Sequence, residues 1–330
     1  MQKFCKKHRV NRIYAKVEGT MANGSEIEIP SEVPQLLMVM RIVYAVVFTA
    51  GTLGNAYVLF QIYKQKSLHT SSFIFVGNQC FLSFFVSCAY IMEPLLKAHI
   101  VSQKAWCHSL VIPYGLNRVM APYVLLLLSI ERYIIIVKPH HRSVINSRKK
   151  IITLAILWIL TAILIILFIK GTELKQKSGC DLKMAFIGVF SEVFLAITCY
   201  IIPMTLTMIF YALIALNFRQ KSTASEKVAS TVTKLARTFF FATVCHSILW
   251  FPYTVLTLIM GFAEVKGNLF MFTGPIISNT LMSISTGVNA WVYIWFAPVM
   301  RDPILAICMS CIPRKCSTVR NLGNIDETVS

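Results

Sequence analysis

The chain has 330 residues, of which 56% are apolar and only 14% are charged, and its formal net charge is +18. A soluble domain usually carries about a quarter charged residues, so a mean hydropathy of +0.65 indicates more apolar surface than a water-facing fold can bury. The basic residues stand in short runs between long apolar stretches, which argues against nucleic-acid binding and favours loops beside a lipid bilayer.

Seven apolar segments are long enough to cross a membrane as helices, because about 20 apolar residues span the hydrocarbon core. They are residues 36–63, 72–96, 105–137, 151–169, 184–218, 228–262 and 269–296. The sequence therefore predicts an all-α fold, a seven-transmembrane helix bundle at residues 36–297. An N-terminal tail at 1–35 precedes the bundle, and residues 298–330 follow it.

Lysine and arginine are more numerous in the connections at one end of this predicted bundle, among them residues 148–150 and 219–227. By the positive-inside rule these connections face the cytoplasm, which places the N-terminus outside the cell. The basic residues at 3–16 oppose this orientation, and translation from Met21 instead of Met1 would remove them; both starts stay open. Asn23 begins an outward Asn-Gly-Ser sequon, so we expect glycosylation there.

Polar residues interrupt the first three segments, although such residues are costly in hydrocarbon unless they have partners. They include Asn55 in the first segment, Asn78 and Ser83 in the second, and Asn117 and Arg118 in the third. The third segment ends with the run Glu131-Arg132-Tyr133 before the basic connection. An ordinary surface charge pair at a membrane edge is the simple alternative for this run.

Tryptophan, proline and tyrosine mark the last four segments. These positions are Trp158 in the fourth, Pro203 and Tyr211 in the fifth, Trp250-Phe251-Pro252-Tyr253 in the sixth, and Asn289-Ala290-Trp291-Val292-Tyr293 in the seventh. A proline inside a helix removes a backbone hydrogen bond and bends the helix. Pro252 could therefore let one half of the sixth helix swing, or it could be a passive kink.

Taken in order, these positions resemble the class A (rhodopsin-like) G-protein-coupled receptors over about residues 36–310. Glu131-Arg132-Tyr133 matches the family's Asp/Glu-Arg-Tyr motif. Asn289 to Tyr293 matches its Asn-Pro-x-x-Tyr motif, with Ala290 in place of proline. The resemblance implies a multi-pass cell-membrane receptor that transmits binding of an extracellular ligand to a heterotrimeric G protein. It implies no enzymatic activity and no cofactor.

The resemblance also assigns a coupling switch, in which Glu131 neutralises Arg132 until activation frees the guanidinium for a G-protein α subunit. The residues of this switch are Glu131, Arg132, Tyr133, Tyr211, Pro252, Asn289 and Tyr293. Anionic membrane lipids and the G protein are expected as partners of the basic stretches 148–150 and 219–227.

Cysteines carry two further implications of the resemblance. A disulfide between Cys107 and Cys180 would hold the second outer loop over the ligand pocket in an oxidising compartment. A short amphipathic helix would lie along the membrane after the seventh span, although Pro303 would weaken it. Cys308, Cys311 and Cys316 beside this helix are palmitoylation candidates, with unmodified thiols as the alternative.

Besides Ala290, four residues depart from the family pattern. Ser83 replaces the usual aspartate of the second helix and Ala121 replaces a sodium-binding serine, which predicts no sodium-dependent allostery. Val232 replaces a glutamate that restrains the switch arginine, and His246 replaces a phenylalanine below Trp250. Both changes predict raised basal activity.

The chemical class of the ligand is narrowed by two ligand-binding residues that this sequence lacks and by one arginine. Tyr114 replaces the aspartate of amine receptors, and the retinal lysine of opsins is missing from the seventh segment. Arg118 either clamps a carboxylate or phosphate, or forms an internal pair with Glu192 or Glu93. The residues expected to bind the ligand, a small molecule, lipid or peptide, are Tyr114, Asn117, Arg118, Glu192, Trp250, Tyr253 and Asn279.

Two rival functions stay open at this point. The altered positions Ser83 and Ala290 are compatible with a receptor-like protein that binds partners but signals weakly or not at all. A membrane transporter is the second alternative, although the sequence shows none of the inverted repeats and interrupted helices typical of one.

Overall fold

The computed structural model describes residues 32–95, 103–144, 146–171, 193–220, 226–262 and 269–311, and the regular structure within them is helical. The long helices are α2 (Glu32–Lys64), α3 (Ser71–Leu95), α4 (Gln103–Val137), α5 (Ser147–Gly171), α7 (Ile202–Gln220), α8 (Glu226–Phe262), α9 (Leu269–Phe296) and α10 (Pro298–Cys311). Short 3-10 helices, η1 (Lys66–Leu68) and η3 (Pro139–Val144), follow α2 and α4. A π-helical turn, η4 (Ile197–Ile201), precedes α7.

Six stretches of the described residues, in α2, α3, α4, α5, η4–α7 and α8, are long and apolar enough to cross a membrane. The seventh predicted segment is helical over its whole length as α9. The fourth predicted segment, at 151–169, lies in α5, which starts earlier, at Ser147. Asn146 accounts for this start, because its Oδ1 accepts a hydrogen bond from the Arg148 backbone N–H at 3.3 Å, a typical helix cap.

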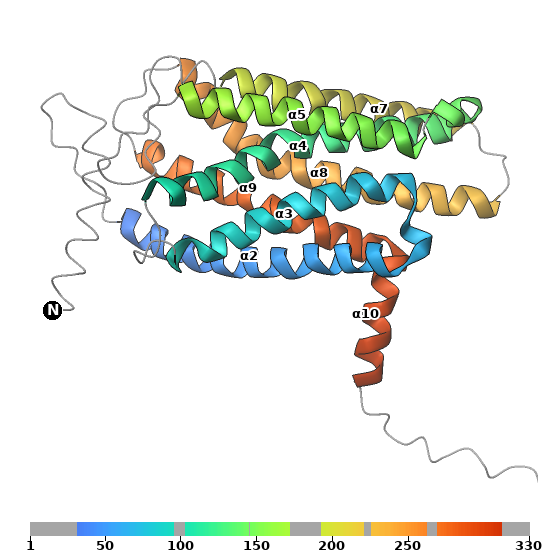
Figure 1. Ribbon diagram of the computed structural model, residues 1–330, viewed down its shortest axis with the longest axis horizontal. Coiled ribbons are helices and arrows are strands. Elements are labelled where there is room, and N and C mark those ends of the chain that lie inside the picture. Colours follow the sequence, from blue (N-terminus) through green and yellow to red (C-terminus); the bar gives the residue numbers. More distant parts are fainter. Residues whose placement is uncertain are drawn as a thin grey trace, which may run out of the picture.

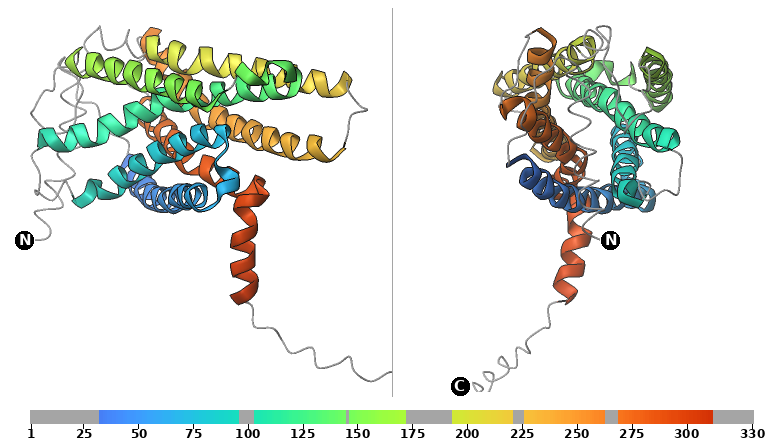
Figure 2. Two further views of the ribbon diagram at one scale, coloured as in Figure 1. Left: turned by 45° about the vertical axis from the view of Figure 1, so that its right-hand side comes forward. Right: turned by 90° about the vertical axis from the view of Figure 1, so that its left-hand side faces the viewer.

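The helices lie side by side along one axis, and the end-on view shows them arranged around a common centre (Figures 1 and 2). α2 packs against α3 and α9, and α9 also packs against α8. α4 contacts α3, α5, α7 and α8. Residues of α4 are therefore positioned to contact side chains from several helices at once.

Polar and apolar side chains are distributed as expected for a helix bundle surrounded by hydrocarbon, with apolar groups outside and amides inside. The outward face of α5 is apolar and exposed, with Ile152, Ile159, Ile163 and Leu167 among its residues, whereas amides such as Asn55 and Gln79 are buried. Hydroxyls bond to carbonyls of their own helices, as Thr207 does to Pro203 at 2.7 Å. Such bonding leaves little polar surface for lipid to contact.

At the end of α9 the chain turns into α10, which runs across the bundle axis (Figure 1). The Tyr57 hydroxyl donates to the Met300 carbonyl at 2.8 Å and fixes this turn to α2. The helix continues through Pro303, which cannot donate to the Val299 carbonyl. The Gln65 side chain donates to that carbonyl at 3.5 Å. We call the bundle end that carries this turn the α10 end.

Several predicted features lie outside the described residues, namely Asn23, Cys180, Glu192 and Cys316. Five further residues are on described helices, but their side chains lie outside the described part: Cys107, Tyr114, Asn279, Cys308 and Cys311. The disulfide, the glycosylation and the palmitoylation therefore stay predictions.

Candidate functional site

A cluster of buried polar side chains from three helices lies at the α10 end. We define it as the ionic cluster: Ser72 of α3, Glu131 and Arg132 of α4, and Lys150 of α5. The side chains of Glu131, Arg132 and Lys150 are 2%, 4% and 6% exposed. Burial on this scale requires that each charge be neutralised by neighbours, because an unpaired buried charge costs several kcal/mol.

The Glu131 carboxylate is bound from two other helices. Its Oε1 accepts a hydrogen bond from the Ser72 hydroxyl at 2.8 Å and another from the Lys150 ammonium. The adjacent guanidinium of Arg132 lies 3.7 Å from Glu131 Oε2, which exceeds hydrogen-bond length. The Glu131–Arg132 pairing expected from the sequence is therefore present, but it is not the shortest contact of the carboxylate.

Further contacts of the Arg132 guanidinium reach α3 and α8. Its Nη2 donates to the Ser72 hydroxyl, and its central carbon lies 5.2 Å above the Phe239 ring of α8. A guanidinium over an aromatic face is stabilised by the ring quadrupole. These contacts connect α4 to α3 and α8, so movement of α8 alters the surroundings of Arg132.

Lys150 differs from the two basic residues before it. Arg148 and Lys149 are exposed, whereas Lys150 is buried. The prediction that the whole 148–150 run contacts anionic lipid is therefore wrong for Lys150. Asn146 caps α5 early enough for this lysine to be part of the helix, and helical phase then turns it towards α4.

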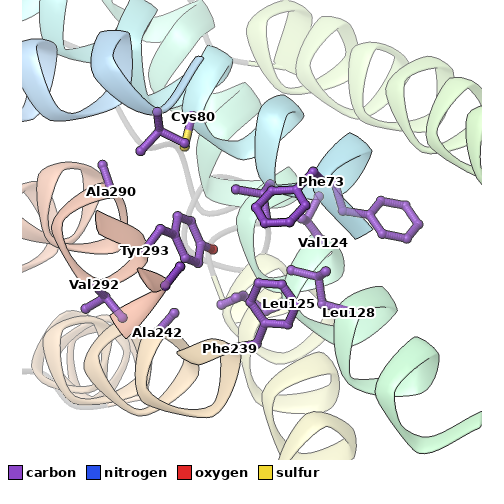
Figure 3. Packing of buried hydrophobic residues seen from close by; sticks show 14 of the residues in the cluster. Phe73, Cys80, Val124, Leu125, Leu128, Phe239, Ala242, Ala290, Val292 and Tyr293 are labelled. Carbon is purple, nitrogen blue, oxygen red and sulfur yellow. The ribbon is translucent and has the colours of Figure 1, made fainter. Parts of the chain in front are cut away.

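An apolar layer of buried side chains from α3, α4, α8 and α9 packs beside the ionic cluster, and Figure 3 shows part of it. Val124, Leu125 and Leu128 of α4 are completely buried there, and Tyr293 packs edge-on against Phe239 at 6.1 Å. In Figure 3 the Tyr293 hydroxyl points towards the centre of the bundle. Because Phe239 also contacts Arg132, this layer adjoins the ionic cluster.

The remaining switch residues occupy different surroundings. Tyr211 is buried and packs edge-on against Phe240 at 5.4 Å. Among the described residues, neither the Tyr211 nor the Tyr293 hydroxyl has a hydrogen-bond partner. Tyr133 instead contacts Phe210 of α7, at 5.4 Å. The structure thus gathers Glu131 and Arg132 in the cluster and places Tyr133 on another face of α4.

The bundle centre holds a chain of neutral polar contacts. The Gln79 amide donates to Asn117 Oδ1 at 3.2 Å and lies 3.4 Å from the Ser83 hydroxyl. Trp250 Nε1 donates to Ser285 Oγ at 2.7 Å and so joins α8 to α9. The predicted ligand residue Asn117 is therefore in contact with α3, next to Ser83.

Asparagines join further helices at the same level. Asn55 Nδ2 donates to the Thr286 carbonyl of α9 at 3.1 Å. Trp158 Nε1 donates to Asn78 Oδ1 at 2.9 Å and joins α5 to α3. Asn289 of α9 is buried as well. These bonds fix the relative rotation of the helices that surround the site.

A small pocket lies in the half of the bundle away from the α10 end. Three predicted ligand residues line it, Arg118, Trp250 and Tyr253, together with Leu195, Ala196, Cys199, Tyr200 and Thr254. The Arg118 guanidinium lies 5.3 Å from the Tyr253 ring centre. Trp250, at the floor of this pocket, stacks on His246 at 5.2 Å. A ligand in the pocket would thus contact the helix that reaches Arg132 at its other end.

Sequence reasoning missed Ser72, Lys150, Gln79 and Ser285 as members of these sites. Lys150 had a detectable signal, because it precedes the inward-facing Trp158 by about two helical turns and hence shares its face. Ser72 had none, since a serine at a helix start is ordinarily a cap. Gln79 and Ser285 are unremarkable until the helices are docked.

Comparison with known proteins decides the family. Residues 54–293 match the model of the 7 transmembrane receptor (rhodopsin family). The chain belongs to this family. It is accordingly a class A G-protein-coupled receptor, a multi-pass protein of the cell membrane, and not an enzyme.

Curated relatives extend the match beyond the family core. Apelin receptor A of Xenopus laevis is 25% identical over 283 residues, covering 78% of this chain and 77% of the relative. Bombesin receptor subtype-3 of Ovis aries is 22% identical, covering 84% and 76%. The RYamide receptor of Tribolium castaneum is 20% identical, covering 86% and 84%.

Proposed function

We propose that this receptor couples an acidic extracellular ligand, bound in the pocket around Arg118, to G-protein activation at the α10 end. The observation that carries the proposal is the buried ionic cluster, which holds Arg132 at the tip of the one helix that also contains Arg118. α8 connects the two sites, because Trp250 and Tyr253 line the pocket and Phe239 contacts Arg132. Outward movement of α8 at Pro252 would expose the guanidinium.

We also propose how the receptor is oriented in the membrane. The α10 end faces the cytoplasm, the N-terminal tail at 1–35 lies outside, and α10 lies along the inner membrane surface. An epitope tag before residue 32 should bind antibody on intact cells, whereas a tag after residue 311 should bind only after permeabilisation. The reverse pattern would refute the orientation.

G-protein coupling is tested by basal signalling of the receptor without ligand. Arg132→Ala should reduce recruitment of every G-protein class to the level of untransfected cells, because the variant lacks the guanidinium that the partner binds. Arg237→Ala is the matched control, since Arg237 is an exposed arginine of α8 at the same end and its loss should leave recruitment near the wild-type level. Surface expression of both variants is measured in parallel.

A wild-type receptor that recruits none of the four G-protein classes, with or without ligand, would favour the alternative of a receptor-like binding protein. The replaced positions Ser83 and Ala290 are the observation that keeps this alternative in the test.

The ligand class is the finer part of the proposal. Arg118 supplies a positive charge among aromatic and small apolar neighbours, and relatives are named as receptors for apelin, bombesin and RYamide. A ligand with an acidic group and an apolar body fits this lining, because a guanidinium binds a carboxylate or phosphate through two parallel hydrogen bonds.

A screen of acidic small molecules, lipids and peptides would identify the agonist. Arg118→Ala should then lower its potency roughly tenfold or more, since hydrogen bonds to charged groups contribute about 1.5–3 kcal/mol. Cys199→Ser, which changes the same lining without changing charge, should have little effect. Loss of surface expression in Arg118→Ala would instead indicate an internal ion pair.

A further inference from the structure

Lys150 is a buried cation in the first turn of a membrane helix, and nothing in the family motifs assigns it a role. Its ammonium donates to Glu131 Oε1 and lies 5.6 Å from the Phe75 ring centre. Moving an ammonium out of water costs several kcal/mol unless a carboxylate and further contacts compensate. A lysine retained at this position therefore points to a specific electrostatic task.

The ionic cluster places two cations beside one carboxylate. Among the described residues, the buried charges at the α10 end are Glu131, Arg132 and Lys150. Lys150 and Ser72 both donate to Glu131 Oε1, whereas Arg132 lies 3.7 Å from Oε2. The carboxylate is thus shared, and each cation weakens the attraction that the other feels.

The Ser72 hydroxyl adds a hydrogen-bonded bridge between the acid and the arginine to their ion pair at 3.7 Å. It accepts a hydrogen bond from Arg132 Nη2 and donates its own proton to Glu131 Oε1 at 2.8 Å. A hydroxyl bridge is neutral, so separating it requires less energy than separating a bidentate guanidinium–carboxylate pair. With Lys150 on the carboxylate, Arg132 is therefore easier to release from Glu131.

We propose that Lys150 is a positioning residue of the receptor switch, which competes with Arg132 for the Glu131 carboxylate and thereby favours the open, coupling-competent state. The inference rests on the proposed G-protein coupling. It assigns Lys150 and Glu131 opposite effects on the switch, because the acid restrains Arg132 and the lysine weakens that restraint.

Lys150→Met tests the proposal, because methionine preserves most of the buried stem and removes the charge. Arg132 should then approach Glu131 to hydrogen-bond distance, and basal G-protein activation per receptor at the surface should fall roughly fivefold, a typical allosteric coupling. Lys150→Arg keeps a cation and should retain basal activity. Lys66→Met is the matched control, since it removes the same charge from an exposed lysine of η1 and should change nothing.

A double substitution separates positioning from mere structural support. If Lys150 acts through the carboxylate, Lys150→Met should cause no further fall in a Glu131→Gln receptor, so the two effects are strongly non-additive. Where the wild-type receptor signals, unchanged or raised basal activity in Lys150→Met overturns the proposal.

A second measurement keeps the inference separate from G-protein coupling. Spectroscopic labels on genetically encoded side chains at the exposed positions His140 of η3 and Lys234 of α8 report the separation between the end of α4 and α8 in purified receptor without G protein. Lys150→Met should shift the distances towards the closed population. If the wild-type receptor does not signal, a shift supports the role of Lys150 while the proposed coupling fails, and identical distances overturn both.

Discussion

At the scale of single residues, His246 is a buried polar side chain without hydrogen-bond partners in the described part of the chain. Its ring is 1% exposed, and neither ring nitrogen has a hydrogen-bond partner among the described residues. It is held by stacking on Trp250 at 5.2 Å. A buried polar group without a partner typically costs about 1–3 kcal/mol, so His246 lowers the stability of the region that joins the pocket to the switch.

His246→Phe should therefore stabilise the receptor by about 1–3 kcal/mol, because phenylalanine keeps the ring stacking and has no nitrogen to satisfy. The melting temperature of solubilised receptor should rise, and basal signalling should fall. His140→Phe, at an exposed position, is the control and should leave both unchanged. A lower melting temperature for His246→Phe would show that the imidazole has a stabilising partner.

At the scale of the helices, the closest backbone-to-backbone approach involving a described glycine joins α2 to α9. A Cβ atom added to Gly287 would lie 3.1 Å from the Gly51 Cα, and one added to Gly51 would lie 3.2 Å from the Gly287 Cα. Small residues permit such contact in membranes, where helices associate mainly through close packing and hydrogen bonds. The nearby bond from Asn55 to the Thr286 carbonyl requires this proximity.

Gly287→Ala should separate α2 from α9 and destabilise the receptor by about 1–3 kcal/mol, the usual cost of overpacking. The obstructing atoms are backbone, which a rotamer change does not relieve. Gly77→Ala is the matched control, because its Cβ would meet only Ile62 Cδ1, at an ordinary 3.7 Å. Thermal unfolding of both variants measures the difference, and equal melting temperatures would contradict the packing argument.

At the scale of the whole molecule, the bundle centre is organised by neutral groups. Gln79 and Asn117 pair across α3 and α4 beside Ser83, the residue that replaces the family's aspartate. An amide donor directed into this space repels a cation, and a serine supplies no charge to attract one. The neutral pair provides a physical reason for the predicted indifference to sodium.

Melting temperature and agonist affinity should accordingly be equal in sodium chloride and potassium chloride at the same ionic strength. Ser83→Asp should introduce a sodium-dependent rise in melting temperature, because it restores a carboxylate. A sodium-specific shift in the wild-type receptor would show that an ion binds despite the substitution.

Much of the fold could be predicted from the sequence, because the surrounding hydrocarbon restricts which backbone structures can form. Hydrocarbon accepts only internally bonded backbone, so the apolar segments had to be helices, and α9 occupies the residues predicted for it. Motifs also identified Glu131 and Arg132, which the structure brings together in one cluster. The start of α5 was placed too late, because the Asn146 cap extends the helix beyond its apolar segment.

The sequence by itself determined which segments are helical and which family the motifs resemble, since both depend on local order along the chain. Only the tertiary structure decided which side chains contact the buried Glu131 carboxylate. Ser72, Glu131 and Lys150 meet because three helices pack with their inward faces together. Contacts between distant helices depend on rotation and depth, which a hydropathy pattern does not encode.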